Sequence, residues 1–220
     1  MKLRIETTYK SKKGTETNFS SDDMSAEKAL VIAEDLQKTG RIKNIHFLDN
    51  YDSTWTLKEL QKYLEEIETE PHNISVYFDG GFDLQSKMSG LGCAIYYEQN
   101  GKSYRLRKNR HVDSLDSNNE AEYGAFHLGV LELESLGAQH QTVSFIGDSQ
   151  VVINQLNGEW ACMEQSLNRW ADRIEEKLQQ LGISAEYTLV SRKQNQEADQ
   201  LASQALNKVE ISSKMEILND

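Results

Sequence analysis

Residues 74–81 read ISVYFDGG, and this segment decides the fold of the larger part of the chain. Its apolar residues predict a strand over Ile74–Asp79 that ends in an aspartate followed by two glycines. The segment Thr142–Asp148, TVSFIGD, predicts a second strand that also ends in an aspartate. Because open α/β sheets bind ligands at the carboxyl ends of their strands, Asp79 and Asp148 are candidate site residues.

Helix and strand patterns surround these two strands. Apolar stripes at helical spacing predict a helix over 118–136 and another over 166–181. The other predicted elements are strands near 91–97, 103–110 and 184–190 and helices near 149–156 and 196–207. Three strands followed by helix–strand units predict an α/β domain over 74–207, with a mixed five-stranded sheet flanked by helices.

A different pattern precedes this domain, and Pro71, the only proline, lies in the polar stretch between the two. The earlier pattern predicts a small α+β unit in the order strand, strand, helix, strand, helix. We therefore expect an accessory domain over 1–68 and a linker over 69–73. Beyond the larger domain we expect a C-terminal tail over 208–220.

Composition narrows the class of protein. The chain has 220 residues, 38% hydrophobic and 27% charged, which suits one large domain or a medium and a small one. Its two cysteines, Cys93 and Cys162, cannot build a disulfide framework, so we expect a cytoplasmic protein. The start of the chain lacks the apolar region of a signal peptide. No apolar run approaches the roughly 20 residues of a membrane span, so no membrane partner is expected.

Acidic residues dominate the charge, with 35 Asp and Glu against 24 Lys and Arg and a formal net charge of −11. Taken alone, this charge disfavours nucleic acid as a partner, because phosphates repel acidic surfaces. A cluster of carboxylates that binds cations reverses the argument locally, because the cations then carry the charge of the site.

Glu122 and Asp199 lie where a lone charge is costly, since each begins the apolar stripe of its predicted helix. If they converge with Asp79 and Asp148, their oxygen atoms form a site for Mg²⁺ or Mn²⁺. Taken singly, each acid also has a structural explanation. Strand-end aspartates form turns or cap helices, and the helix dipole favours acids in a first turn.

Four motifs around these acids resemble those of type 1 ribonuclease H and follow the order of that family. They are Phe78-Asp79-Gly80-Gly81, residues 117–123 (SNNEAEY), Gly147-Asp148-Ser149-Gln150 and residues 195–202 (NQEADQLA). The resemblance covers roughly residues 73–207 and implies a ribonuclease H-like fold. It implies that Asp79, Glu122, Asp148 and Asp199 are both the catalytic residues and the ligands of Mg²⁺ or Mn²⁺, with two ions per site in the substrate complex. It also implies hydrolysis of the RNA strand of an RNA/DNA hybrid by a two-metal mechanism, in which the ions stabilise the attacking and leaving oxygens.

The same resemblance implies that Asn118, Asn119 and Gln150 bind substrate. Their amides carry donors and acceptors suited to the 2′-hydroxyls in the minor groove of an A-like duplex. Ordinary helix capping is the alternative for Asn118 and Asn119, since Ser117 and Glu120 have the spacing of a capping box.

Arg192 resembles the arginine that some family members carry where others have a mobile histidine, which implies contact with the scissile phosphate or a part in product release. A surface pair with Lys193 is the alternative. Residues 102–110 (KSYRLRKNR) add five basic residues, which favour either phosphate contact by about half of them or a charged edge strand.

Three features depart from the family pattern. Residues 82–88 (FDLQSKM) add an acid, residues 157–168 (NGEWACMEQSLN) contain two glutamates and no Lys or Arg, and no histidine follows His140. We expect a metal-dependent endonuclease whose partner is the RNA/DNA hybrid, with a homodimer through the accessory domain as a further option. Two alternatives stay open: a ribonuclease H-like module that binds nucleic acid or protein with little cleavage, and a structured-DNA nuclease of the same fold.

Overall fold

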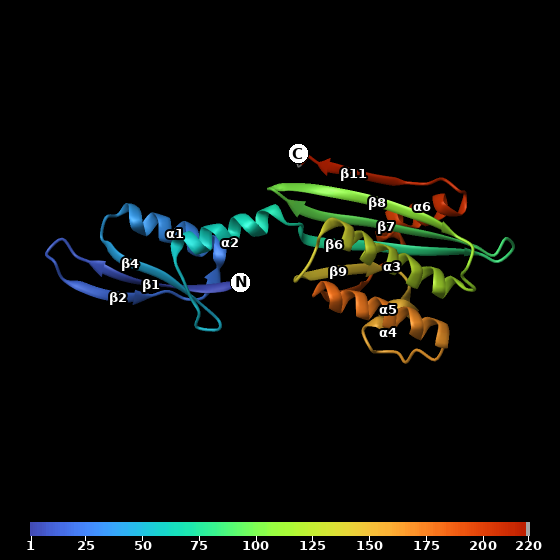
Figure 1. The fold of residues 1–220 in the computed structure, drawn as a ribbon, viewed down its shortest axis with the longest axis horizontal. Helices are drawn as coiled ribbons and strands as arrows, with labels where there is room; N and C mark the ends of the chain where they lie inside the picture. Colours follow the sequence, from blue (N-terminus) through green and yellow to red (C-terminus); the bar gives the residue numbers. More distant parts are fainter. Residues whose placement is uncertain (219–220) are drawn as a thin grey trace. The chain divides into compact units, whose positions relative to one another are not determined.

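Strand β6 (His72–Asp83) begins the larger part of the fold and lies in the middle of its sheet. The computed structural model describes residues 1–218. The chain divides into two compact units, one over residues 1–69 and one from Glu70 onward, and Figure 1 shows the elements of each.

The sheet of the larger unit has six strands in the order β10-β9-β6-β7-β8-β11. Strands β6, β7 and β8 form an antiparallel meander, β9 joins β6 in parallel, and β10 joins β9 in parallel. The remaining strands are β7 (Met88–Gln99), β8 (Lys102–Val112), β9 (Thr142–Gly147), β10 (Ser184–Leu189) and β11 (Ser212–Ile217). The predicted mixed α/β architecture is confirmed.

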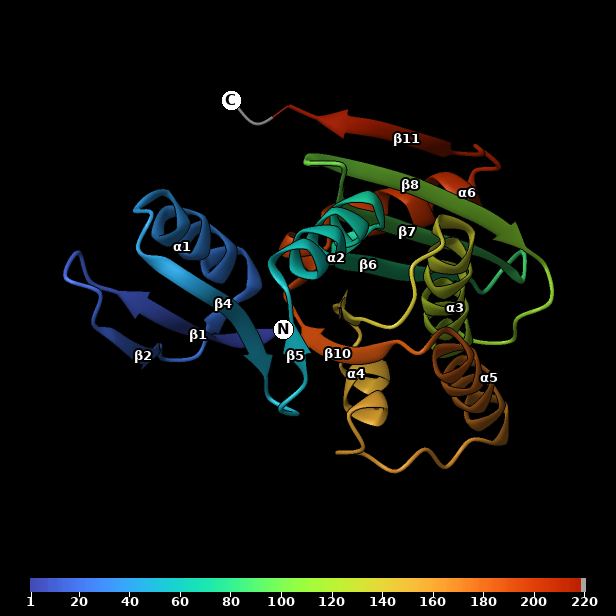
Figure 2. The ribbon, with the colours of Figure 1, turned by 60° about the vertical axis from the view of Figure 1, so that its left-hand side comes forward.

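Helices cover both faces of this sheet, as the alternation of side chains along β6 requires. A Cβ atom on Gly80 would meet Ala121 of α3, whereas a Cβ atom on Gly81 would meet Leu206 of α6. Helices α3 and α6 therefore pack on opposite faces, and α5 lies beside α3 (Figure 2). The helices are α3 (Asn118–Leu136), α4 (Gln150–Leu156), α5 (Gln165–Leu181) and α6 (Gln196–Leu206), with a 3₁₀ turn at Arg192–Gln194.

The core of the larger unit is densest between the sheet and α3. Phe78, Phe126 and Phe145 are fully buried there, and the ring of Phe126 lies 5.1 Å from that of Phe78 and 4.7 Å from that of Phe145, measured between centroids. Truncating one such ring costs about 3–5 kcal/mol, so this packing holds the strand ends that carry Asp79 and Asp148.

Two predicted boundaries are wrong. Residues 212–217, expected in a tail over 208–220, form β11 and make the sheet six-stranded rather than five-stranded. In this segment Met215 and Ile217 alone alternate with polar residues, a pattern too short to predict a strand, and its backbone pairs with groups that the edge of β8 would otherwise leave free. Residues 219–220 of that tail lie outside the described residues. The linker expected over 69–73 is shorter, because α2 ends at Thr69 and β6 already begins at His72. The pairing of β6 with β7 shifts register between His72 and Ser75, so the first residues of the strand do not follow its regular alternation.

The smaller unit is a sheet with two helices packed on one face (Figure 1). Its strand order is β2-β1-β4-β5, with β3 also paired to β1, and its core is built on Leu3, Ile5, Phe47 and Leu60. The two-residue strands β3 and β5 are too short for periodicity to reveal. Its elements are β1 (Lys2–Lys10), β2 (Glu16–Ser20), β3 (Met24–Ser25), α1 (Ala26–Lys38), β4 (Ile42–Asp49), β5 (Thr54–Trp55) and α2 (Leu57–Thr69). Within residues 1–218, no helix has the length and apolarity needed to cross a membrane.

Candidate active site

Gly80 brings helix α3 against the end of strand β6. A Cβ atom at this position would lie only 2.1 Å from the backbone carbon of Ala121, so the contact requires glycine. In this arrangement the Gly80 N–H donates a hydrogen bond of 3.2 Å to Oε2 of Glu122. The glycine that follows Asp79 therefore brings the first two predicted acids to the same place.

Asn195 ties a third and a fourth segment to this edge. It directly precedes α6, is 1% exposed, and donates from Nδ2 to the Phe78 carbonyl at 2.9 Å and to Oδ1 of Asp148 at 2.7 Å. Sequence reasoning placed Asn195 inside a motif and assigned it no role. The signal in the sequence that could have indicated this role is a polar amide directly before an apolar helix. If the fold buries such an amide, its donors and acceptors must be satisfied by hydrogen bonds.

Asp79 and Glu122 have strongly raised pKa values. Burial is the main cause, and it raises the pKa of Asp79 to about 7 and that of Glu122 to about 9. The negative charge of Asp148 raises both pKa values further, and Asp199 adds to the effect on Asp79. The structure thus brings together all four predicted acids.

Arg192 supplies positive charge beside these acids. Its guanidinium donates to Oδ1 of Asp199 from Nε at 3.0 Å and also from Nη2. The Arg192 side chain is 78% exposed and that of Asp199 is 27% exposed, so the pair lies at the open side of the cluster. A residue expected to bind substrate is therefore engaged with an acid of the same site.

The donor atoms of this cluster fit a hard divalent cation, because four carboxylates offer oxygen ligands only. Across residues 1–218, however, no three His, Cys, Asp or Glu side chains already stand in the arrangement of a metal site. The ion pair with Arg192 already occupies Oδ1 of Asp199. Binding a cation through that oxygen therefore requires Asp199 to turn from Arg192.

Asn118, Asn119 and Gln150 lie at the starts of α3 and α4. Ser117, rather than either asparagine, caps α3, since its Oγ accepts a hydrogen bond of 3.2 Å from the Glu120 N–H. Among the described residues, the three amide side chains find no hydrogen-bond partner within the chain. They remain available to an external ligand.

The basic stretch 102–110 is mostly neutralised within the fold. Arg105 and Arg107 point to the α6 face of the sheet, where they contact the Glu197 carboxylate at 3.2 and 3.1 Å. These two arginines are therefore engaged by Glu197 and are not free to contact phosphate. Arg110, at the end of the stretch, faces the side of α3 instead.

Residues 157–164, between α4 and α5, project apolar side chains without positive charge. Trp160 is 45% exposed and Met163 is 89% exposed, and both flanking charges, Glu159 and Glu164, are negative. This loop offers surfaces for stacking but no cation for a phosphate.

A mixed sheet between α3 and α6, with acids converging at the ends of β6 and β9, defines a protein with the ribonuclease H fold. Ribonuclease H1 of the halophilic archaeon Halobacterium salinarum NRC-1 is 26% identical with a TM-score of 0.52, over 61% of this chain and 98% of that chain. LC11 ribonuclease H1, isolated from compost by a metagenomic approach, has a TM-score of 0.56 at 22% identity, over 62% of this chain and 98% of that chain. The latter structure is a complex with an RNA/DNA hybrid.

Residues 77–205 match the protein family described as "Reverse transcriptase-like". The chain belongs to this family, as a member of the ribonuclease HI-like group, and the resemblance drawn from its four motifs is confirmed. It is also 43% identical over 208 residues to the uncharacterized protein YpeP of Bacillus subtilis strain 168, across 94% of this chain and 92% of that protein. That relative spans both units of the fold.

Proposed function

We propose that this chain is a divalent-metal-dependent endonuclease that hydrolyses the RNA strand of RNA/DNA hybrids. One observation carries the proposal: Asp79, Glu122, Asp148 and Asp199, from four separate segments, converge at one edge of a ribonuclease H sheet. The hybrid bound to LC11 ribonuclease H1, which shares this fold, supports the choice of substrate.

The four carboxylates would hold the Mg²⁺ or Mn²⁺ ions. Such ions stabilise the negative charge that develops on the attacking and leaving oxygens of a phosphodiester. The chain's own part is to fix the ligands, with the Gly80 N–H orienting Glu122 and the Asn195 amide orienting Asp148. These two donors act from buried backbone and buried side chain, so the carboxylates they hold lose little freedom when they bind an ion.

Arg192 has two alternative partners, Asp199 and a substrate phosphate. An exposed ion pair is worth at most about 1 kcal/mol, so exchange between the two is easy. When Asp199 turns to bind an ion, the guanidinium is left at the open side of the site, where it can neutralise the phosphate that approaches.

The free amides of Asn118, Asn119 and Gln150 are proposed to read the substrate. An amide can donate to and accept from a 2′-hydroxyl, which DNA lacks. Because Ser117 already caps α3, this role does not compete with helix stability.

A cleavage assay on four labelled substrates tests the proposal: hybrid, duplex RNA, duplex DNA and branched DNA, each with Mg²⁺ and with Mn²⁺. We expect the RNA strand of the hybrid to be cut and duplex DNA to be spared. Equal cutting of hybrid and duplex DNA would contradict the role of the amides. Cutting of branched DNA alone would favour a structured-DNA nuclease.

A second candidate is a module that binds hybrid and cuts it weakly or not at all. It is favoured by the ion pair between Arg192 and Asp199 and by the acidic loop over 157–164. Tight hybrid binding in the assay above, without metal-dependent products, would support this candidate and exclude the first.

The unit over residues 1–69 is proposed to be an accessory module. Lys12 and Lys13 are exposed at its β1–β2 hairpin, where they can approach phosphate. Homodimerisation through this unit and a cytoplasmic location, which the two unpaired cysteines favour, stay predictions.

A further inference from the structure

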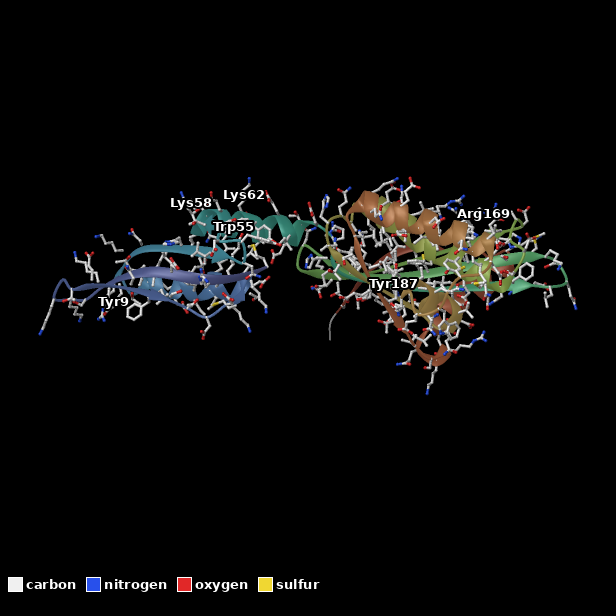
Figure 3. All side chains as sticks on the ribbon, turned by 90° about the horizontal axis from the view of Figure 1, so that it is seen from below. Tyr9, Trp55, Lys58, Lys62, Arg169 and Tyr187 are labelled. Carbon is white, nitrogen blue, oxygen red and sulfur yellow. The ribbon has the colours of Figure 1, made fainter. Side chains whose placement is uncertain are left out.

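A groove of about 590 Å³ runs between α3, α5 and the end of β8. Its floor is apolar, with Leu91 from β7, Leu115 from the loop before α3 and Leu128 from α3. Three arginines stand at its rim, Arg110 from β8 and Arg169 and Arg173 from α5. Figure 3 labels Arg169, whose side chain extends from the outer surface of α5.

These three guanidinium groups have no carboxylate within ion-pair distance among residues 1–218. By contrast, Lys177 on the same helix α5 is paired with Glu134 at 2.7 Å. In a chain with a net charge of −11, three unpaired arginines around one groove are a local reversal of sign. Such a reversal is the electrostatic signature of a site for a polyanion.

Aromatic and imidazole groups complete one wall of the groove. The guanidinium of Arg173 lies over the Trp170 ring, 5.0 Å from its centroid, and the His127 ring packs against the same indole at 5.5 Å. Burial lowers the pKa of His127, and the positive charges of Arg173, Lys177 and Arg110 lower it further, so these cations converge on it. Stacking on Trp170 holds the guanidinium plane while its N–H edges stay free for bidentate contact with phosphate.

The groove follows α3 away from the acid cluster. Its α3 side runs from Glu120 to Leu131, about 16 Å of helix, which is the axial rise of about five base pairs. It starts at Asp116 and Glu120, at the first turn of α3, the same turn that carries Asn118 and Glu122. A duplex that spans this turn with a phosphate at the acids can therefore continue along the arginines. Asp116 and Glu120 lie at this starting end, and the Glu120 carboxylate already accepts the Asp116 N–H at 2.9 Å.

We propose that Arg110, Arg169 and Arg173 form the phosphodiester-backbone grip of this protein, in place of positive charge on the loop 157–164. This inference rests on the proposed function for the identity of the duplex as an RNA/DNA hybrid. The cations of the grip come from β8 and α5, two elements already fixed by the core, so they need no ordering on binding.

The test is equilibrium binding of a short fluorescent RNA/DNA hybrid to the full chain in chelator, as a function of salt between about 50 and 200 mM. The variant Arg169→Gln/Arg173→Gln should bind roughly tenfold more weakly at the lowest salt, with a salt slope smaller by about 2. Arg169→Lys/Arg173→Lys should restore the salt slope but only part of the affinity, because the charge remains while the bidentate contact is lost. Unchanged thermal midpoints would establish that the exposed substitutions leave the fold intact.

Lys102→Gln/Lys177→Gln is the matched control. It removes the same charge from the same unit, but both lysines are already paired, with Glu216 at 2.8 Å and with Glu134. It should change the affinity less than twofold. An equal loss in control and test variants would mean a general charge effect and would overturn the grip.

Cleavage of the same hybrid, measured beside binding, separates the two proposals. If Arg169→Gln/Arg173→Gln binds like wild type while wild type cuts the hybrid, the grip is wrong and the proposed function stands. If wild type binds through these arginines but cuts nothing, the grip stands and the proposed function fails. Absence of hybrid binding by wild type would overturn both.

Discussion

Helix α3 stands between two concentrations of unbalanced charge, the acid cluster at its first turns and the arginine groove along its α5 side. The acids are buried and close together, with Glu122 6% exposed and Asp79 9% exposed. The arginines of the groove are exposed and spread over several turns of helix. The two sites therefore suit different ligands. A small, largely buried cluster of carboxylates suits a compact cation, whereas an exposed row of guanidinium groups suits a polyanion such as a nucleic-acid backbone.

Glu120 and Glu122 of α3 make this comparison more precise, because both side chains are buried but their hydrogen-bond partners and neighbouring charges differ. Glu120 accepts the Asp116 N–H within a capping arrangement, and no acid of the cluster lies against it. Glu122 accepts only the Gly80 N–H and faces Asp79 and Asp148. A buried acid that is satisfied by hydrogen bonds stabilises its helix, whereas a buried acid that faces other carboxylates has a raised pKa.

The largest effect is expected from Glu122→Gln. Hybrid cleavage should fall about a thousandfold or more, since an ion ligand is lost while Gln can still accept the Gly80 N–H. The thermal midpoint in chelator at pH 8 should rise by roughly 5 °C, because Glu122 must take up a proton to be neutral in the folded state at this pH, whereas Gln is neutral already. Calorimetry and the cleavage assay measure both. Glu120→Gln is the matched control and should keep both cleavage within a few fold and the thermal midpoint nearly unchanged, because Gln can still accept the Asp116 N–H. Loss of cleavage in both variants would refute the distinction.

The pH dependence of stability gives a second view of the same cluster. The folded chain holds protons on Asp79 up to about pH 7 and on Glu122 up to about pH 9, whereas the unfolded chain releases them near pH 4. Stability in chelator should therefore fall as pH rises through this window, since the folded state binds more protons. Glu122→Gln should flatten that fall. A thermal midpoint that rises from pH 5 to pH 8 in wild type would contradict the assigned burial of these acids.

Asn195→Ala should have the next largest effect. It removes two buried hydrogen bonds and leaves the Phe78 carbonyl unpaired, which costs roughly 2–3 kcal/mol. Because Asp148 loses its orienting donor, cleavage should fall about 10- to 100-fold. Denaturant unfolding and single-turnover cleavage provide the measurements. Asn207→Ala, at the exposed end of the same helix, should cost less than 1 kcal/mol and spare activity. Equal effects at the two positions would reduce Asn195 to an ordinary helix-end residue.

Arg192→Gln should have a smaller effect, which lowers the thermal midpoint without metal but increases the stabilisation by added metal. In chelator the thermal midpoint should drop by about 2 °C, since the acids lose the positive charge of the Arg192 guanidinium. The rise in midpoint on adding Mn²⁺ should become larger than in wild type, because Asp199 no longer has to leave a partner. A metal-induced rise that is unchanged or smaller would show that Arg192 does not compete for this carboxylate.

The smallest effect is expected from removing residues 1–69. The core residues of the two units are separate sets, so the unit from Glu70 onward should fold with a thermal midpoint within about 3 °C of its transition in the full chain. Metal-dependent cleavage should persist, because all four acids lie in the retained part. An insoluble or unfolded product would place the boundary between the units elsewhere. A selective loss of hybrid affinity would make the smaller unit a binding module.

Local patterns predicted most of the larger unit. The helix over 118–136 was predicted from its apolar stripe and ends in the structure at Leu136, before a left-handed Gly137. β11 was not predicted because only Met215 and Ile217 alternate with polar residues there, and because the strand is stabilised by an edge that only the assembled sheet presents. The roles of Arg105 and Arg107 could not be predicted either, since Glu197 meets them only after α6 packs on the sheet.

The sequence by itself determined the order of elements, the four acids and the family, because periodicity and motif spacing are local properties of the chain. Only the tertiary structure decided which charges are balanced. Arg192 is adjacent to Lys193 in sequence but bonds Asp199, and Asn195 reaches Asp148 across 47 positions. Likewise, Arg110 meets Arg169 and Arg173 in one groove although β8 and α5 are far apart in the chain. Electrostatic balance depends on distances through space, and those distances exist only once the sheet and its two layers of helices have packed.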